Sequence, residues 1–348
     1  MKATTMADQP NYLGATIFWL YILAALMLTG LVIYTIISIP QKPRQHQLSQ
    51  SKKDVTIFAC LAGISFAVLS ANMLNVLVQS FMSWTYSHRL RMPKDPTGLL
   101  SMIWRWSVTS TLFEDFGKAI VADNARYLWT GSALSFTFHV CLYMGVEGTV
   151  CCSNTVGEIA DLESPGKRRQ IPRLWALFCL SQILPISFTQ NLFYVAVVRS
   201  GYNAGTTDIP RTFPRFVGTL YFSCLLLAPP YGLGTSTLLI PLILFARSLL
   251  FTPLILSRTI GKGQHSDDAP PTGQTQFGSA VMSVSFALWQ IGLVAYEKKS
   301  PLQISSALFD HPAVRSLGCD FLIGMVSFAI WTRRYRSSEK EIDSKKAS

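Results

Sequence analysis

The stretch SFTQNLFYVAVV (Ser187–Val198), which follows Pro185, is the part of the sequence that most constrains the fold. It belongs to an apolar run typical of a membrane span, yet four polar side chains fall within five positions: Ser187, Thr189, Gln190 and Asn191. A buried amide without a hydrogen-bond partner costs about 2–7 kcal/mol, and lipid offers no partner. We therefore expect these side chains to meet other polar groups inside the protein.

The composition predicts a multi-pass membrane protein. The chain has 348 residues, of which 49% are hydrophobic and 14% charged, whereas about a quarter of the residues are charged in an average soluble protein. The apolar residues occur in blocks of about twenty, the length that a helix needs to cross a bilayer. The net charge of +11 does not indicate nucleic-acid binding, because the basic residues lie between and after these blocks.

The expected fold is an all-α integral membrane protein, a polytopic bundle of about eight transmembrane helices. The spans are expected near residues 12–39, 55–81, 127–150, 174–198, 216–232, 234–257, 278–297 and 314–332. Between the second and third spans, the second half of residues 82–126 mixes tryptophans with charges, which predicts a helix lying at the membrane interface. We expect one transmembrane domain over residues 1–336 and a polar cytosolic tail over residues 337–348.

The ends of the chain predict an orientation. An even number of spans places both termini on one side, and Arg333, Arg334 and Arg336 directly after the last span favour the cytosol. The final residues KKAS, with Lys345 and Lys346, look like the dilysine retrieval signal of endoplasmic-reticulum membrane proteins. We therefore expect a location in the endoplasmic reticulum with cytosolic termini.

Further polar side chains recur inside the predicted spans: Asn72, Asn75, Gln79, His139, Tyr143, Glu147, Gln182, Arg247, Gln290 and Asp320. One interpretation is hydrogen bonding between helices, at about 0.6–2 kcal/mol for each bond. The other is the wall of a polar binding chamber, and the density of these residues favours it. His139 alone is better explained as a buried histidine than as a metal ligand, because no second ligand follows at metal spacing.

Four longer stretches resemble the fungal membrane-bound terpene cyclases of meroterpenoid pathways, of the ascochlorin, ascofuranone and macrophorin type. They are ARYLWT (125–130), YMGVEG (143–148), IPRLWALFCLSQI (171–183) and ISFTQNLFYVAVV (186–198). The resemblance covers roughly residues 110–200, and it extends to the other spans only as a hydrophobic pattern. It implies cyclisation of a farnesylated phenol or quinone-like compound, started when an acid protonates an epoxide or alkene, without metal or other cofactor.

The resemblance also implies roles for particular side chains. Glu147 or Asp123 is the expected proton donor, and Glu114 and Asp115 are the reserve acids. The residues expected to bind substrate or to orient the acid are Arg126, Trp129, His139, Tyr143, Gln182, Ser187, Gln190, Asn191 and Phe193. An alternative for Glu147 is an ion pair at the end of the span with Arg168 or Arg169.

Two other classes of membrane protein share parts of this pattern. A membrane prenyltransferase needs two aspartate-rich motifs that hold magnesium and diphosphate, and neither Asp123-Asn124 nor Asp267-Asp268 makes that motif. A transporter or receptor for a small lipophilic molecule also uses polar residues within its spans. No internal repeat supports the transporter interpretation.

Overall fold

The structure is a computed structural model, and it describes residues 12–39, 48–109, 112–150, 171–200, 212–233, 239–255 and 272–347. These residues form helices and no strand, which confirms the predicted all-α class. The first five helices are α1 (Tyr12–Ser38), α2 (Leu48–Ser87), α3 (Pro96–Thr109), α4 (Leu112–Val121) and α5 (Asn124–Val150). The others are α6 (Leu174–Ile183), α7 (Ile186–Ser200), α8 (Thr212–Leu233), α9 (Leu239–Leu249), α11 (Thr272–Tyr296), α12 (Pro301–Asp310) and α13 (Pro312–Ala347).

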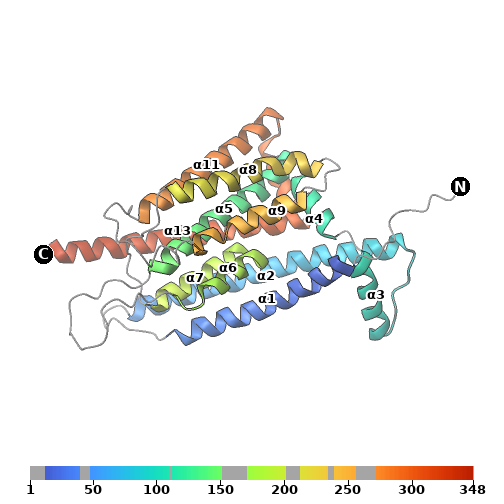
Figure 1. Cartoon of the computed structure of the whole chain (residues 1–348), viewed down its shortest axis with the longest axis horizontal. Helices are drawn as coiled ribbons and strands as arrows, with labels where there is room; N and C mark the ends of the chain where they lie inside the picture. Colours follow the sequence, from blue (N-terminus) through green and yellow to red (C-terminus); the bar gives the residue numbers. More distant parts are fainter. Residues whose placement is uncertain are drawn as a thin grey trace.

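Helix α5 forms the centre of the bundle (Figure 1). It packs against α4, α6, α7, α8, α11, α12 and α13, and most of its side chains are buried. Helix α13 runs parallel to it, because the ring of Phe328 meets His139 and the indole of Trp331 meets Tyr143 farther along both helices. A side chain at Gly324 of α13 would collide with the ring of Phe136, so glycine permits this close approach.

Within the described ranges, three helical segments are long and apolar enough to cross a membrane: Gly14–Ser38, Lys52–Ser87 and Pro312–Arg334. Shorter apolar helices occupy Leu174–Ile183, Phe216–Pro229, Pro241–Ile255 and Val281–Tyr296. Helix α1 exposes large apolar side chains, among them Leu26, Met27 and Ile37. A helix that leaves such residues uncovered is suited to lipid contact, and each of the eight predicted span ranges contains a helix.

The prediction of one continuous span at residues 174–198 is wrong, because this segment folds as a helical hairpin. Helix α6 ends at Ile183, and Leu184 has an extended conformation (φ −107°, ψ 173°) before α7 begins beyond Pro185. Proline lacks an N–H and disfavours a helical residue before it, so the chain is free to turn here. Helices α6 and α7 pack against each other in one half of the bundle (Figure 1), and we call them the α6–α7 hairpin.

Contacts with α1 establish the reversal of direction. Near the start of α6, Arg173 Nη1 donates to Thr35 Oγ1 at 3.4 Å, and near the end of α7, Arg199 Nη2 donates to the Ile37 carbonyl at 3.2 Å. Both ends of the hairpin therefore lie at the same end of α1. Its tip lies halfway along the bundle, because the end of α6 contacts Tyr21, near the middle of α1.

The hairpin changes the expected topology. Among the described helices, α6 and α7 form a hairpin, whereas the prediction counted residues 174–198 as one span. Helix α1 begins beside α3, where Trp19 Nε1 donates to Ser107 Oγ at 3.4 Å, whereas the later part of α13 reaches the start of α2, where Arg334 pairs with Asp54. The described start of α1 and the described end of α13 lie at opposite ends of the bundle, the α3 end and the hairpin end (Figure 1), and the side of a membrane on which each lies stays a prediction.

Two further expectations concern the α3 end and the C-terminal tail. Helix α3 lies across the end of the bundle (Figure 1) and exposes Leu100 and Trp104, as an interfacial helix would. Its position at a membrane surface stays a prediction.

The domain boundary expected at residue 336 falls within α13, which continues without a break to Ala347.

Candidate functional site

The tip of the α6–α7 hairpin is held by a carboxylate from another helix. The N–H groups of Ile186 and Ser187, the first of α7, donate to Oδ2 and Oδ1 of Asp320 at 2.9 Å each. The Ser187 hydroxyl also donates to Asp320 Oδ1. Asp320 comes from α13 and is 7% exposed. A negative charge at a helix N-terminus satisfies unpaired donors and complements the helix dipole, so Asp320 acts as the cap of α7.

The carbonyl groups at the end of α6 are satisfied in the same way. In a continuous helix, Gln182 and Ile183 would accept from the N–H groups four residues later, but Asp320 takes those donors. The Gln182 carbonyl instead accepts from Nη1 of Arg247, in the last turn of α9, and the Ile183 carbonyl accepts from the Tyr21 hydroxyl of α1. Side chains from three helices therefore replace the missing backbone bonds.

These contacts explain the polar cluster in the opening stretch. Ser187 also bonds the hydroxyl of Ser65 on α2, Gln190 Nε2 donates to the Tyr194 hydroxyl at 2.8 Å, and Asn191 Nδ2 donates to the Ser187 carbonyl at 2.7 Å. Ser187, Gln190 and Asn191 are all 0% exposed. The bonds of Gln190 and Asn191 lie within α7, and that of Ser187 joins α7 to α2, whereas their part in a substrate chamber stays a prediction.

An aromatic cluster lies beside the hairpin, and we define it as Phe58, Tyr143, Phe193, Tyr194 and Trp331. The indole of Trp331 stacks on Tyr194 with 4.5 Å between ring centroids, and its Nε1 donates to the Tyr143 hydroxyl at 2.6 Å. The Tyr143 ring meets Phe193 edge-on at 5.9 Å, and Phe58 meets both Tyr194 and Trp331. The structure thus joins the predicted Tyr143 and Phe193 with three rings that the sequence analysis did not name.

Glu147 borders this cluster. It lies one turn beyond Tyr143 on α5 and is 3% exposed. Arg168 and Arg169, its alternative partners, lie outside the described residues. Glu147 is therefore a buried carboxyl group one helical turn from Tyr143 of the cluster.

Two other predicted residues lie nearby on α5 and α6. His139 is 5% exposed and sits between the rings of Phe136 and Phe328, which fits a buried histidine between helices. Gln182 Nε2 donates to Ser181 Oγ at 3.1 Å, next to the Cys141 thiol. Within the described residues, no group of three or more histidine, cysteine or acidic side chains is arranged to hold a metal ion.

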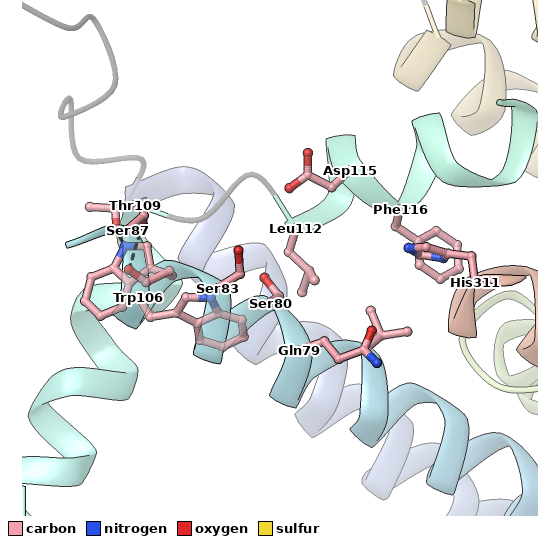
Figure 2. A pocket seen from close by; sticks show the side chains of 12 residues that line it. Gln79, Ser80, Ser83, Ser87, Trp106, Thr109, Leu112, Asp115, Phe116 and His311 are labelled. Carbon is pink, nitrogen blue, oxygen red and sulfur yellow. Dashed lines mark hydrogen bonds between the residues drawn. The ribbon is translucent and has the colours of Figure 1, made fainter. Parts of the chain in front are cut away.

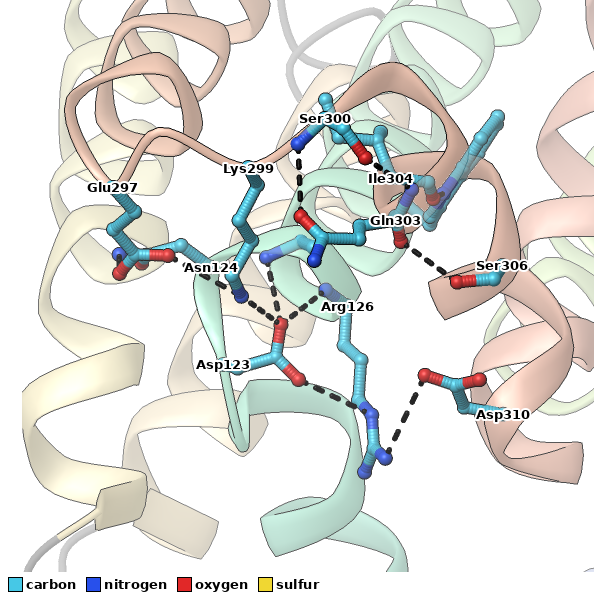
Figure 3. A network of polar contacts seen from close by, with 12 residues as sticks. Asp123, Asn124, Arg126, Glu297, Lys299, Ser300, Gln303, Ile304, Ser306 and Asp310 are labelled. Carbon is cyan, nitrogen blue, oxygen red and sulfur yellow. Dashed lines mark hydrogen bonds and ion pairs between the residues drawn. The ribbon is translucent and has the colours of Figure 1, made fainter.

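Asp123 belongs to a network at the α3 end of the bundle (Figure 3). Its Oδ1 accepts from the backbone N–H of Ala125 and Arg126 at 2.9 and 3.1 Å and from Lys299 Nζ at 2.9 Å, while Oδ2 pairs with Arg126 Nε at 3.2 Å. Burial favours the neutral acid, but the hydrogen bond from Lys299 and the backbone donors outweigh it and lower the pKa of Asp123. An ionised carboxylate has no proton to donate, so these contacts favour a capping role.

The same network ties α12 to α5. Arg126 Nη2 lies 4.0 Å from Asp310, and Trp129 Nε1 donates to the Ile304 carbonyl at 2.8 Å. Both predicted substrate-binding residues thus contact protein groups of α12. Whether they also bind substrate stays a prediction.

A cavity of about 370 Å³ opens at the α3 end between α2, α3, α4 and the residue before α13 (Figure 2). Asp115, one of the reserve acids, lines it, while the side chain of Glu114 lies outside the described residues. The lining is Val76, Gln79, Ser80, Ser83, Trp84, Ser87, Trp106, Thr109, Leu112, Asp115, Phe116 and His311. We call it the α3-end cavity.

The structure does not bring the predicted acids together. Asp123 and Asp115 lie at the α3 end, and Glu147 lies near the other end of α5. Twenty-three residues of helix at 1.5 Å each separate Glu147 from Asn124, roughly 35 Å. One small substrate cannot therefore contact both Glu147 and Asp115.

Comparisons of the chain with protein-family models, with curated proteins and with solved structures find no match. The resemblance to terpene cyclases therefore stays a prediction.

Proposed function

We propose that the chain is a membrane-bound terpene cyclase that cyclises a farnesylated phenol or quinone-like compound, with Glu147 as the proton donor. The observation that supports this choice is the burial of Glu147 on α5, one turn from Tyr143 of the aromatic cluster. A general acid must carry its proton at neutral pH, and surroundings without water favour the protonated carboxyl group. Asp123 does not meet this condition, because Lys299 and Arg126 hold it ionised.

The proposed reaction is an isomerisation that needs no oxidant or cofactor. The carboxyl group of Glu147 transfers its proton to the oxygen of a terminal epoxide, or to a terminal alkene carbon. Opening of the C–O bond, or protonation of the double bond, leaves a carbocation that neighbouring double bonds attack to form the rings. A base then removes a proton from the last carbocation, so the product has the same composition as the substrate.

The aromatic cluster is suited to the second requirement, stabilisation of the cation. The faces of Tyr, Trp and Phe rings attract positive charge, most strongly where water is excluded. Phe193, Tyr194 and Trp331 are all at least nine-tenths buried, in the cluster that also contains Tyr143. The hydrogen bond from Trp331 Nε1 to the Tyr143 hydroxyl fixes two of the rings relative to each other.

The proposed membrane arrangement follows the helices. Seven helices cross the bilayer, the α6–α7 hairpin enters from one side and returns to it, and α3 lies at the opposite interface. Re-entrant helices are tolerated at membrane depth where protein groups satisfy their ends, as Asp320, Arg247 and Tyr21 do here. With the dilysine end in the cytosol, the hairpin end faces the cytosol of the endoplasmic reticulum and α1 begins on the lumenal side.

The decisive experiment expresses the wild-type chain, Glu147→Gln and the control Glu297→Gln in a fungal host fed a farnesylated phenol epoxide. Membrane fractions are checked for each protein, and extracts are analysed by mass spectrometry and NMR. We expect a cyclic product of unchanged mass from wild type and control, and at least a hundredfold less from Glu147→Gln. Full activity in Glu147→Gln would exclude this donor, and no product from wild type across several prenylated phenols would exclude the function.

The α6–α7 hairpin also favours a second candidate, a transporter for a small lipophilic molecule. Half-helices that end at membrane depth form the substrate sites of many transporters. Here, however, Asp320 caps the start of α7 and Arg247 binds the end of α6, so the protein's own groups occupy the ends that a substrate would use. Gradient-dependent uptake into vesicles, without conversion of the compound, would support the transporter; product formation in detergent would support the cyclase.

A further inference from the structure

The turn after α2 holds a basic residue in a strained backbone conformation. Arg89 lies two residues beyond the end of α2 and has a φ of 53°, in the left-handed region. Its N–H donates to the Tyr86 carbonyl at 3.0 Å, and the N–H of Leu90 donates to the Thr85 carbonyl at 3.1 Å, the two bonds of a Schellman cap. Glycine is the usual residue at this position, because residues with a side chain rarely adopt that conformation. An arginine there calls for a functional explanation.

The other left-handed residues provide a comparison. Among the described residues, three that are not glycine have a positive φ: Arg89, Arg173 and Lys298. The Arg173 side chain is used inside the protein, where it donates to Thr35 Oγ1 at 3.4 Å and lies over the ring of Tyr34. Lys298 caps α11 and follows Glu297, a carboxylate that pairs with Lys299 at 3.3 Å. Arg89 has neither a contact of this kind nor an acid beside it in the chain.

Exposed cations gather in the segment that contains Arg89, and we call residues 88–109 the α2–α3 segment. Its basic side chains are Arg89, Arg91, Lys94 and Arg105, which are all exposed and form no ion pair among the described residues. Its one acidic residue, Asp95, accepts from the Gly98 N–H at 2.6 Å and from the Thr97 hydroxyl at 2.7 Å. The carboxylate therefore caps α3, and the positive charge of the segment is left uncompensated.

Apolar and aromatic side chains are exposed beside these cations. Helix α3 lies across the end of the bundle (Figure 1) and exposes Leu100 and Trp104, while Tyr86 at the end of α2 is 87% exposed. Tryptophan and tyrosine are enriched where a membrane meets water, and basic residues beside them attract anionic headgroups. A soluble acidic partner would match the charge but would not account for the exposed aromatic side chains.

We propose that the α2–α3 segment binds the headgroups of anionic phospholipids, with its four cations on the lipid phosphates and Trp104 and Leu100 at the acyl boundary. The proposal rests on the membrane arrangement proposed above, with α3 at an interface, and is independent of the cyclase reaction. It adds a preference for one class of lipid and assigns that preference to named side chains. It also gives Arg89 a role that glycine could not fill.

The test places the purified full-length protein in nanodiscs of phosphatidylcholine that contain a trace of a photoactivatable lipid. The probe is either phosphatidylglycerol or phosphatidylcholine with the same reactive headgroup, and mass spectrometry quantifies lipid adducts on peptides from the α2–α3 segment. We expect at least about tenfold more adducts from phosphatidylglycerol, because each nearby cation contributes roughly fivefold. Equal adducts from both lipids would overturn the proposal. So would loss of the adducts on addition of excess glycerol phosphate, which would indicate a site for a soluble phosphate.

Three variants assign the preference to side chains. Arg89→Gly should lower the enrichment of phosphatidylglycerol about fivefold, and the triple variant Arg89→Gly/Arg91→Gln/Lys94→Gln should abolish it. The matched control is Lys298→Gly, which removes one exposed cation from the same kind of cap on α11 and should leave the enrichment unchanged. Unchanged enrichment in the triple variant, or an equal loss in Lys298→Gly, would contradict the assignment.

Thermal unfolding in a neutral detergent separates loss of a lipid contact from loss of structure. Glycine fits the left-handed position of residue 89 without strain, so Arg89→Gly should melt at or above the wild-type temperature. A clearly lower melting temperature would show that the arginine supports the fold, which contradicts the proposal. Because no substrate is present in these measurements, failure of the cyclase function would leave their outcome unaffected.

Discussion

The tip of the α6–α7 hairpin and the α3-end cavity use polar groups in opposite ways. At the tip, the backbone groups exposed by the break find partners in Asp320, Arg247 and Tyr21, each from a distant part of the chain. In the cavity, the buried N–H of Trp106 has no partner among the described residues. The comparison shows that the backbone groups at the break all find partners, whereas some buried side-chain atoms, such as Trp106 Nε1 and Asn191 Oδ1, have none among the described residues.

The largest expected effect concerns Asp320. Replacement Asp320→Leu leaves two buried N–H groups and a hydroxyl at the start of α7 unsatisfied, which should cost about 3–5 kcal/mol of unfolding free energy. Asp320→Asn keeps one carbonyl oxygen and should lose less. Thermal unfolding in detergent measures both. If Asp320→Leu melted like wild type, the Asp320 cap would not stabilise the α6–α7 hairpin, and the conclusion that the groups at the tip depend on partners from distant helices would be wrong.

A smaller loss is expected from Arg247→Met. The Gln182 carbonyl would lose its donor while staying inside the bundle, at a cost of about 1–3 kcal/mol. Methionine keeps most of the side-chain length, so packing changes little. The matched control is Arg105→Met on exposed α3, which should melt like wild type. An equal loss in both variants would point to net charge as the cause.

The smallest effect should come from the ion pairs of Asp123. Its side chain is 36% exposed, so solvent screening limits their contribution to about 1 kcal/mol or less. Because the folded-state pKa is lowered, this stability is present above the unfolded-state pKa near 4 and is lost as pH falls through the lower folded value. Asparagine preserves a cap but removes the charge.

The measurement for Asp123 is a pair of melting curves, wild type and Asp123→Asn, recorded from pH 7 to pH 3. The stability difference should be constant above about pH 5 and should shrink as the solution becomes more acidic. A difference that grew toward low pH would mean that the folded protein favours the protonated carboxyl group. Asp123 would then return as a candidate proton donor.

The site could be predicted in part. The expectation that Ser187, Gln190 and Asn191 meet polar groups inside the protein is confirmed for the Ser187 hydroxyl and for the two amide N–H₂ groups, whereas Gln190 Oε1 and Asn191 Oδ1 have no partner among the described residues. Asp320 was noted as a polar residue in the last span, but its partners were not, since 133 positions separate it from Ser187. The sequence does not reveal that Trp106 Nε1 lacks a hydrogen-bond partner, because every tryptophan has the same N–H group and only the folded structure places acceptors near it.

The apolar blocks predicted which segments are helical, because block length is a local feature, although the break at Pro185 was not predicted. The reversal of direction between α6 and α7 depends on contacts with distant parts of the chain. A break at proline permits a chain either to continue across the bundle or to turn back. The choice depends on which distant side chains meet the freed backbone groups, and in this protein Asp320, Arg247 and Tyr21 meet them in the reversed arrangement.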